Sequence, residues 1–212
     1  MSTPRVKVCG ITRPEDGQMA LSLGASYLGF ILYSKSPRSI DLEEFASLNV
    51  SLTDSFRVVV DVRPEMDKVK QYVSAGFDFF QIHFSDVHDA EYLAELTELV
   101  GRDRLWLAPK LPPETLFPES LFDYTDNFLM DTFQKDGFGG SGKTGDWAGF
   151  RQLKNDYPEK TWILAGGLNP DNIEDAVKQA EADIVDVSSG LESSPGIKSE
   201  EKLRAFFENL ST

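Results

Sequence analysis

Short apolar runs alternate with amphipathic stretches along the whole chain. Most of the runs are nearly continuous, as in Phe128-Leu129-Met130 and Trp162-Ile163-Leu164-Ala165, and strands buried on both faces of a parallel sheet have this pattern. Eight strands are predicted from it: Val6–Ile11, Tyr27–Leu32, Arg57–Val62, Asp78–His83, Arg104–Leu111, Asn127–Thr132, Thr161–Gly166 and Asp183–Ser188.

The segments between the strands have helical spacing. Apolar residues recur every three or four positions from Ile173 to Ala180 and again from Leu203 to Leu210, which predicts helices with one buried face. Asp41 and Asp146 precede two of the helical stretches and are suitable N-cap residues, because a short carboxylate accepts hydrogen bonds from the first free backbone amides.

Eight strand–helix units in 212 residues predict an α/β fold, a (β/α)8 TIM barrel in which residues 1–212 form a single catalytic domain. An open, doubly wound sheet is the structural alternative. In either fold the chemistry lies beyond the carboxyl ends of the strands. The residues that follow the predicted strands are therefore the ones to examine.

Composition narrows the class of protein. The formal net charge of −14 argues against nucleic acid or an anionic membrane as a partner. The single cysteine, Cys9, cannot build a disulfide framework. The first residues have no apolar signal-peptide region, and no run approaches the roughly 18 apolar residues of a membrane span. A cytoplasmic location is expected.

Cys9 and Asp131 stand at the ends of the first and sixth predicted strands. Cys9 is either a small buried hydrophobic residue or a thiolate base or nucleophile whose pKa is lowered by nearby cations. A carboxylate such as Asp131, directly after three apolar strand residues, is costly to bury unless it is paired or functional, so catalysis is favoured there. Asp61, at the end of the third strand, is a weaker candidate for the same role.

Two further side chains lie at the predicted mouth of the barrel. Arg38, beside a proline, is either solvated or holds a carboxylate or phosphate with two hydrogen bonds. His83, at the end of the fourth strand, either assists a proton transfer or supports the pocket. No group of histidine, cysteine and acidic residues has metal-ligand spacing, so no metal is expected.

Glycine-bearing turns follow the seventh and eighth strands, at Gly166-Gly167 and Ser189-Gly190. Bare backbone amides there can approach an anion, and a short helix after the eighth strand would direct its N-terminus at that anion. Barrel enzymes frequently bind phosphate between these two loops. The pattern therefore predicts a phosphate site at Gly166, Gly167, Ser189 and Gly190, and two ordinary tight turns are the alternative.

Residues 137–144 match the P-loop pattern letter by letter. The context is wrong for a P-loop, because several residues separate this segment from the preceding strand and the next helix begins only after Gly145. A glycine-rich lid after the sixth strand is the better interpretation.

These pieces together resemble the phosphoribosylanthranilate isomerase family of tryptophan biosynthesis. The segments that carry the resemblance follow one another in order: Lys7–Thr12, Ser36–Arg38, Gln81–His83, Phe128–Thr132, Gly139–Thr144, Leu164–Leu168, Ser188–Glu192 and Pro195–Lys198. The chain departs from the family pattern at three places along the predicted mouth, with Phe84 after the fourth strand, Asp61 in the third and Pro109 in the fifth.

The resemblance implies an Amadori rearrangement of N-(5-phosphoribosyl)anthranilate to an aminoketose. It assigns Asp131 as general acid, Cys9 as general base with a pKa lowered by Lys7 or by the bound cationic imine, and Arg38 as the ligand of the anthranilate carboxylate. No cofactor is implied, and the partner is a small phosphorylated substrate bound by a monomer or homodimer. Another phosphosugar aldose–ketose isomerase, or a non-catalytic phosphate-binding module, is the alternative function.

Overall fold

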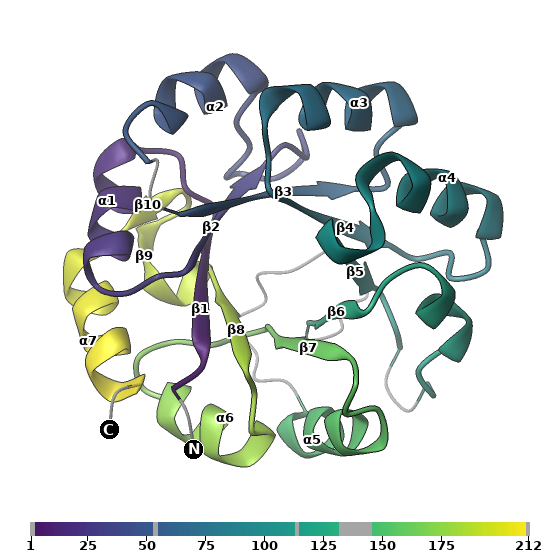
Figure 1. Ribbon diagram of the computed structural model, residues 1–212. Helices are drawn as coiled ribbons and strands as arrows, with labels where there is room; N and C mark the ends of the chain where they lie inside the picture. Colours follow the sequence, from purple (N-terminus) through teal and green to yellow (C-terminus); the bar gives the residue numbers. More distant parts are fainter. Residues whose placement is uncertain (1–2, 53–54, 113–114, 132–145, 211–212) are drawn as a thin grey trace.

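A computed structural model describes residues 3–52, 55–112, 115–131 and 146–210. Its eight parallel strands pair in sequence order and close into a barrel, because the first strand also pairs with the eighth (Figure 1). The strands are β1 (Arg5–Cys9), β2 (Tyr27–Ile31), β3 (Phe56–Val62), β4 (Phe79–Phe84), β5 (Leu105–Pro109), β6 (Asn127–Met130), β7 (Thr161–Leu164) and β8 (Ile184–Val187). The predicted (β/α)8 barrel is confirmed.

Helices surround the barrel. They are α1 (Pro14–Ser22), α2 (Leu42–Asn49), α3 (Met66–Ala75), α4 (Ala90–Val100), α5 (Trp147–Asp156), α6 (Ile173–Ala180) and α7 (Glu200–Leu210). Asp41 caps α2 by accepting from the amides of Glu43 and Glu44, and Asp146 caps α5 by accepting from the Gly149 amide. Between β5 and β6 the described residues form a 3-10 helix, η2 (Glu119–Asp123), where the repeat predicts an α-helix.

The inside of the barrel is built in layers, each supplied by alternate strands. Following the register around the closed sheet, Gly29, Gln81, Leu129 and Asp186 come from β2, β4, β6 and β8 at one height. The next layer towards the carboxyl ends holds Cys9, Val60, Ala108 and Ala165, and above it lie Ile31, His83, Asp131 and Ser188. Below these layers, large apolar side chains fill the barrel.

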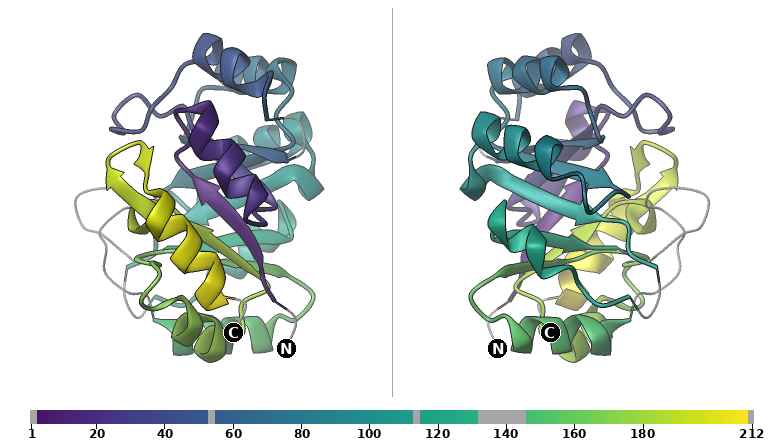
Figure 2. Two further views of the ribbon diagram at one scale, coloured as in Figure 1. Left: turned by 90° about the vertical axis from the view of Figure 1, so that its left-hand side faces the viewer. Right: turned by 90° about the vertical axis from the view of Figure 1, so that its right-hand side faces the viewer.

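The strand ends differ slightly from the prediction. β7 and β8 end at Leu164 and Val187, so the residues from Ala165 and Ser188 onward are free to form the loops of the mouth. After β8 a single 3-10 turn, η3 (Ser189–Leu191), leads into a small hairpin of β9 (Glu192–Ser194) and β10 (Ile197–Lys198). Figure 2 shows this hairpin and the β2–α2 loop on the same side of the barrel.

The P-loop-like segment, residues 137–144, lies outside the described residues, as does Thr132. Within the described part of the chain, no helix is both long enough and apolar enough to cross a membrane.

Candidate active site

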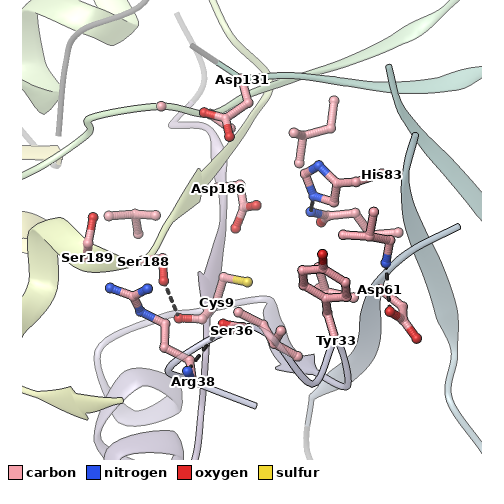
Figure 3. A pocket seen from close by; sticks show the side chains of 18 of the residues that line it. Cys9, Tyr33, Ser36, Arg38, Asp61, His83, Asp131, Asp186, Ser188 and Ser189 are labelled. Atoms are coloured by element: carbon pink, nitrogen blue, oxygen red, sulfur yellow. Dashed lines mark hydrogen bonds between the residues drawn. The ribbon is translucent and has the colours of Figure 1, made fainter. Parts of the chain in front are cut away.

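A cavity of about 520 Å³ opens at the carboxyl ends of the strands. Seven of the nine predicted site residues line it: Cys9, Arg38, His83, Asp131, Gly166, Gly167 and Ser189. They come from loops and strands that are far apart in the sequence. Figure 3 shows Cys9 and Asp131 facing the same space, with His83 across from them. The other two, Lys7 and Gly190, are not among the residues that line it.

Cys9 lies at the end of β1 and is 5% exposed. Its side chain fits because Gly29, its neighbour on β2, has none: a Cβ at Gly29 would lie 2.8 Å from the Cys9 Sγ and 2.9 Å from the Lys7 Nζ. The thiol and the ammonium therefore share the space above Gly29. Lys7 is fully buried, and its Nζ donates to the Asp186 carboxylate at 2.9 Å.

The expectation of a lowered Cys9 pKa is wrong for the protein without substrate. Burial raises the pKa of the thiol and outweighs the charge of Lys7, which lowers it. Asp186 adds to the rise, and Lys198 opposes it. For Lys7 the balance is reversed: burial lowers its pKa, but Asp186 and then Cys9 outweigh the burial, so that the pKa of Lys7 is raised. The ammonium stays charged beneath a neutral thiol.

The two aspartates considered for the acid lie on opposite sides of their strands. Asp131 follows β6, is partly buried and lines the cavity. Asp61 also borders the cavity, but its carboxylate turns towards α3, where it accepts from the Lys68 Nζ at 2.8 Å and from the Tyr72 hydroxyl at 2.5 Å. Asp61 is thus held by structural partners, and Asp131 is the aspartate whose position within the barrel suits an acid.

His83 and Gln81 project from β4 into the cavity. The Gln81 Nε2 lies 2.9 Å from the His83 Nε2. Burial and then the charge of Lys7 lower the pKa of His83 to about 4. The imidazole is therefore neutral at pH 7, where it can donate from one ring nitrogen and accept at the other.

Arg38 reaches the cavity from the β2–α2 loop and is held in place by hydrogen bonds to the buried carboxylate of Glu192. Its Nε and Nη2 donate to Glu192 at 2.8 and 2.7 Å. The Lys198 Nζ donates to the same carboxylate at 2.9 Å and to the Cys9 carbonyl at 2.6 Å. Although burial opposes ionisation, the Arg38 hydrogen bonds and the Lys198 charge lower the pKa of Glu192. The second terminal nitrogen of Arg38, Nη1, makes no hydrogen bond within the described residues.

The loop after β7 is shaped to present backbone amides. Gly166 and Gly167 have φ angles of 93° and 64°, a left-handed conformation that glycine adopts without strain. The side chains of Asn169 and Asn172 donate to the Gly167 carbonyl. Neither glycine amide has an acceptor within the part of the chain that the structure describes. Successive free backbone amides in a turn are suited to binding an anion.

Gly190 is a packing residue and does not line the cavity. A Cβ there would lie 2.0 Å from the Leu168 carbonyl oxygen, so only glycine lets the loop after β8 approach the loop after β7. The expected helix N-terminus after β8 is only the 3-10 turn η3. The amides of the two loops, rather than a helix dipole, are what the structure offers to an anion.

Several charged or polar residues of the site were not singled out in the sequence, among them Gln81, Asp186, Glu192 and Lys198. The signal for Asp186 is a carboxylate inside the apolar run Ile184–Val187, which must have a buried partner. Glu192 and Lys198 sit in the segments of family resemblance, but only the fold shows that they meet Arg38 and Cys9.

The three departures from the family pattern do not all line the mouth as expected. Phe84 is 2% exposed and packs in the core between the barrel and its helices, because its position on β4 alternates with the inward-facing His83. Asp61 faces α3 for the same reason. In the fifth strand it is Ala108, and not Pro109, that faces into the barrel.

Comparison with known proteins agrees with this geometry. The family model of N-(5'-phosphoribosyl)anthranilate (PRA) isomerase matches residues 6–209. The isomerase of that name from Microcystis aeruginosa is 31% identical over 208 residues, which cover 97% of each protein. The crystal structure of phosphoribosyl anthranilate isomerase from Thermus thermophilus covers 98% of both chains at 32% identity, with a TM-score of 0.80.

A further phosphoribosyl anthranilate isomerase structure was solved in complex with reduced 1-(o-carboxyphenylamino)-1-deoxyribulose 5-phosphate. It covers 98% of both chains at 29% identity, with a TM-score of 0.74. These matches confirm the resemblance seen in the sequence: the chain belongs to the N-(5'-phosphoribosyl)anthranilate isomerase family.

Proposed function

We propose that this barrel performs the isomerisation of its family with Asp131 as general acid and Cys9 as general base. Asp131 gives a proton to the furanose ring oxygen of N-(5-phosphoribosyl)anthranilate, the bond from C1 to that oxygen breaks, and a protonated imine forms at C1. Cys9 then takes the proton from C2, and the electron pair moves into a C1–C2 double bond. The resulting enolamine tautomerises to the ketone.

A neutral thiol in the free protein has to become a base during the reaction. The positive charge of the imine forms close to Cys9, beside the ammonium of Lys7, and an adjacent cation lowers the pKa of a thiol. The base is thus activated by the intermediate that it deprotonates. His83, neutral at pH 7, can hydrogen-bond the substrate without adding charge.

The two ends of the substrate are held on opposite sides of the chemistry. Arg38, fixed by Glu192, holds the anthranilate carboxylate, for which its Nη1 remains available. The phosphate lies between the loops after β7 and β8, on the amides around Gly166, Gly167 and Ser189, while Gly190 allows the two loops to approach each other. The net charge of −14 means that the protein as a whole repels a phosphate dianion. Oriented backbone amides can reverse the electrostatic field locally and so bind the dianion.

The observation that carries this proposal is that Cys9, Asp131, Arg38 and the glycine loops line one cavity. The test is to follow the loss of the fluorescence of the anthranilate nucleotide with purified protein. Turnover supports the proposal, and the reduced compound bound by the relative should inhibit it. Absence of turnover with folded protein would contradict it.

We further infer that residues 1–212 work as one domain, since β1 and β8 from the two ends of the barrel pair directly. No cofactor is needed for the proposed steps, because the imine itself accepts the electrons. A monomer or homodimer, no nucleic acid partner and no membrane partner remain predictions.

A further inference from the structure

The Gln81 amide is buried in the floor of the cavity with one of its two polar atoms unused. The residue is 2% exposed. Its Nε2 lies against the His83 Nε2, whereas its Oε1 has no hydrogen-bond partner in the described chain. If the amide were turned over, one polar atom would still face His83 and the other would still be unpaired. A buried polar atom without a partner destabilises a fold, so its presence at a cavity wall calls for a ligand.

The neighbouring charge favours the orientation in which the amide oxygen is the unpaired atom. The Lys7 Nζ occupies the space where a side chain at Gly29 would lie, and Gly29 belongs to the same layer of the barrel as Gln81. A carbonyl oxygen is stabilised near an ammonium, and an amide N–H is not. The unpaired atom is therefore an acceptor, and it requires a donor from the ligand.

The height of Gln81 in the barrel indicates which part of the substrate it meets. Its layer lies directly beneath the layer of Cys9. If Cys9 is the base, the carbon that it deprotonates, C2, sits just above this floor. The only donor attached to C2 is its hydroxyl group.

We propose that the Gln81 Oε1 accepts a hydrogen bond from the C2 hydroxyl of the sugar and so fixes C2 over Cys9. This inference rests on the proposed function, because it uses the place of C2 in the reaction. The hydroxyl is a donor in the substrate and in the enolamine. The hydroxyl is lost when the C2 ketone forms. Gln81 therefore hydrogen-bonds the substrate and the intermediate but not the product.

The test compares two ligands that differ at this one group. The product carries a ketone at C2, and reduction of that ketone gives a hydroxyl. Inhibition constants for the product and for the reduced compound are measured in the parent, in Gln81→Met and in Gln179→Met. The last variant makes the same change on the exposed face of α6 and serves as the control.

In the parent and in Gln179→Met, the hydroxyl compound should bind more tightly than the ketone. The ratio of the two inhibition constants should be about tenfold smaller in Gln81→Met, which corresponds to the loss of one hydrogen bond. Gln81→Met should also keep its Tm within about 2 °C of the parent or raise it, because it removes an unpaired buried atom. A preference unchanged by Gln81→Met would overturn the inference, and a fall in Tm alone would assign Gln81 a structural role. Turnover of N-(5-phosphoribosyl)anthranilate by the parent is measured first. If the parent showed no turnover, the proposed function would be overturned, and this inference with it.

Discussion

Lys7 and Asp186 form a buried ion pair that joins β1 to β8, with 2.9 Å between Nζ and Oδ1, directly beneath the Cys9 thiol. Neither side chain has an alternative partner of opposite charge among the described residues. Removing one member of such a pair leaves an uncompensated charge in the interior, which costs about 3–5 kcal/mol. The pair therefore supports both the closure of the barrel and the electrostatics of the site.

Lys7→Met should lower the free energy of unfolding by about 3–5 kcal/mol, since Asp186 loses its counter-charge. It should also raise the pKa of Cys9 further, because the charge that opposes burial is gone. Urea unfolding measures the first effect, and the pH dependence of thiol alkylation measures the second. The double variant Lys7→Met with Asp186→Leu should regain much of the stability. A double variant less stable than Lys7→Met would contradict the ion-pair explanation.

The reactivity of the Cys9 thiol should rise with pH. Because burial holds the pKa of Cys9 above its ordinary value, the thiol is protonated at pH 7 and ionises only as the pH increases. The rate of its alkylation by iodoacetamide should climb by about tenfold per unit between pH 7 and 8.5. The profile of kcat/KM should be flatter, because the gain in ionised Cys9 is opposed by loss of the proton that Asp131 has to give. Cys9→Ser should lose the alkylation and at least about a hundredfold in kcat while its Tm stays near that of the parent. A near-normal kcat in Cys9→Ser would mean that Cys9 is not the base.

Asp131→Asn should reduce kcat by at least about a hundredfold, since an amide has no ionisable proton to give. The matched change Asp61→Asn should leave kcat within a few-fold of the parent. It should instead lower stability by about 1.5–3 kcal/mol, because the carboxylate that receives Lys68 and Tyr72 loses its charge. Steady-state kinetics and urea unfolding on both variants decide the assignment, and reversed outcomes would exchange the two roles.

Arg38→Met should raise KM by about ten- to a hundredfold with a smaller change in kcat, because a charge-assisted contact with the carboxylate is worth roughly 1.5–3 kcal/mol. Arg57→Met is a suitable comparison, since Arg57 pairs with Asp78 near the start of β3, away from the cavity. Its KM should match that of the parent. If Arg38→Met also had an unaltered KM, the carboxylate would have to bind elsewhere.

Phosphate should bind between the loops after β7 and β8, and Gly190→Ala should weaken its competitive inhibition by at least about tenfold. The methyl group would lie 2.0 Å from the Leu168 carbonyl oxygen, which forces the two loops apart and spreads the amides. Gly190→Glu adds a negative charge to the same displacement and should abolish the inhibition. Equal inhibition constants in parent and variants would place the anion at another site, and residues 137–144 would then be the first to test.

The fold could be predicted from the sequence because strands buried on both faces of a barrel appear as nearly continuous apolar runs. Runs such as Trp162–Ala165 are apolar on both faces, and eight of them separated by helical periodicity leave few architectures. The loop between β5 and β6 escaped this reasoning, because a 3-10 turn such as Glu119–Asp123 has no periodicity of its own.

The residues that reach the cavity could also be found from the sequence, because they follow the predicted strands. The side chains with which they pair could not be found in this way. Arg38 meets Glu192 across 154 positions of sequence, and Lys7 meets Asp186 across 179. The pKa of Cys9 was misjudged for the same reason, since the sequence shows the nearby lysine but not how completely the fold shields the thiol from water.

The ion pair that joins β1 to β8 also has a consequence in time. Lys7 leaves the ribosome before Asp186, which is added 179 positions later. At about 5–20 residues per second, the lysine waits on the order of ten seconds or longer for its partner. During that interval its charge can stay only in water. β1 cannot take its final place in the interior until β8 has been made, and the reactive centre between them cannot form earlier.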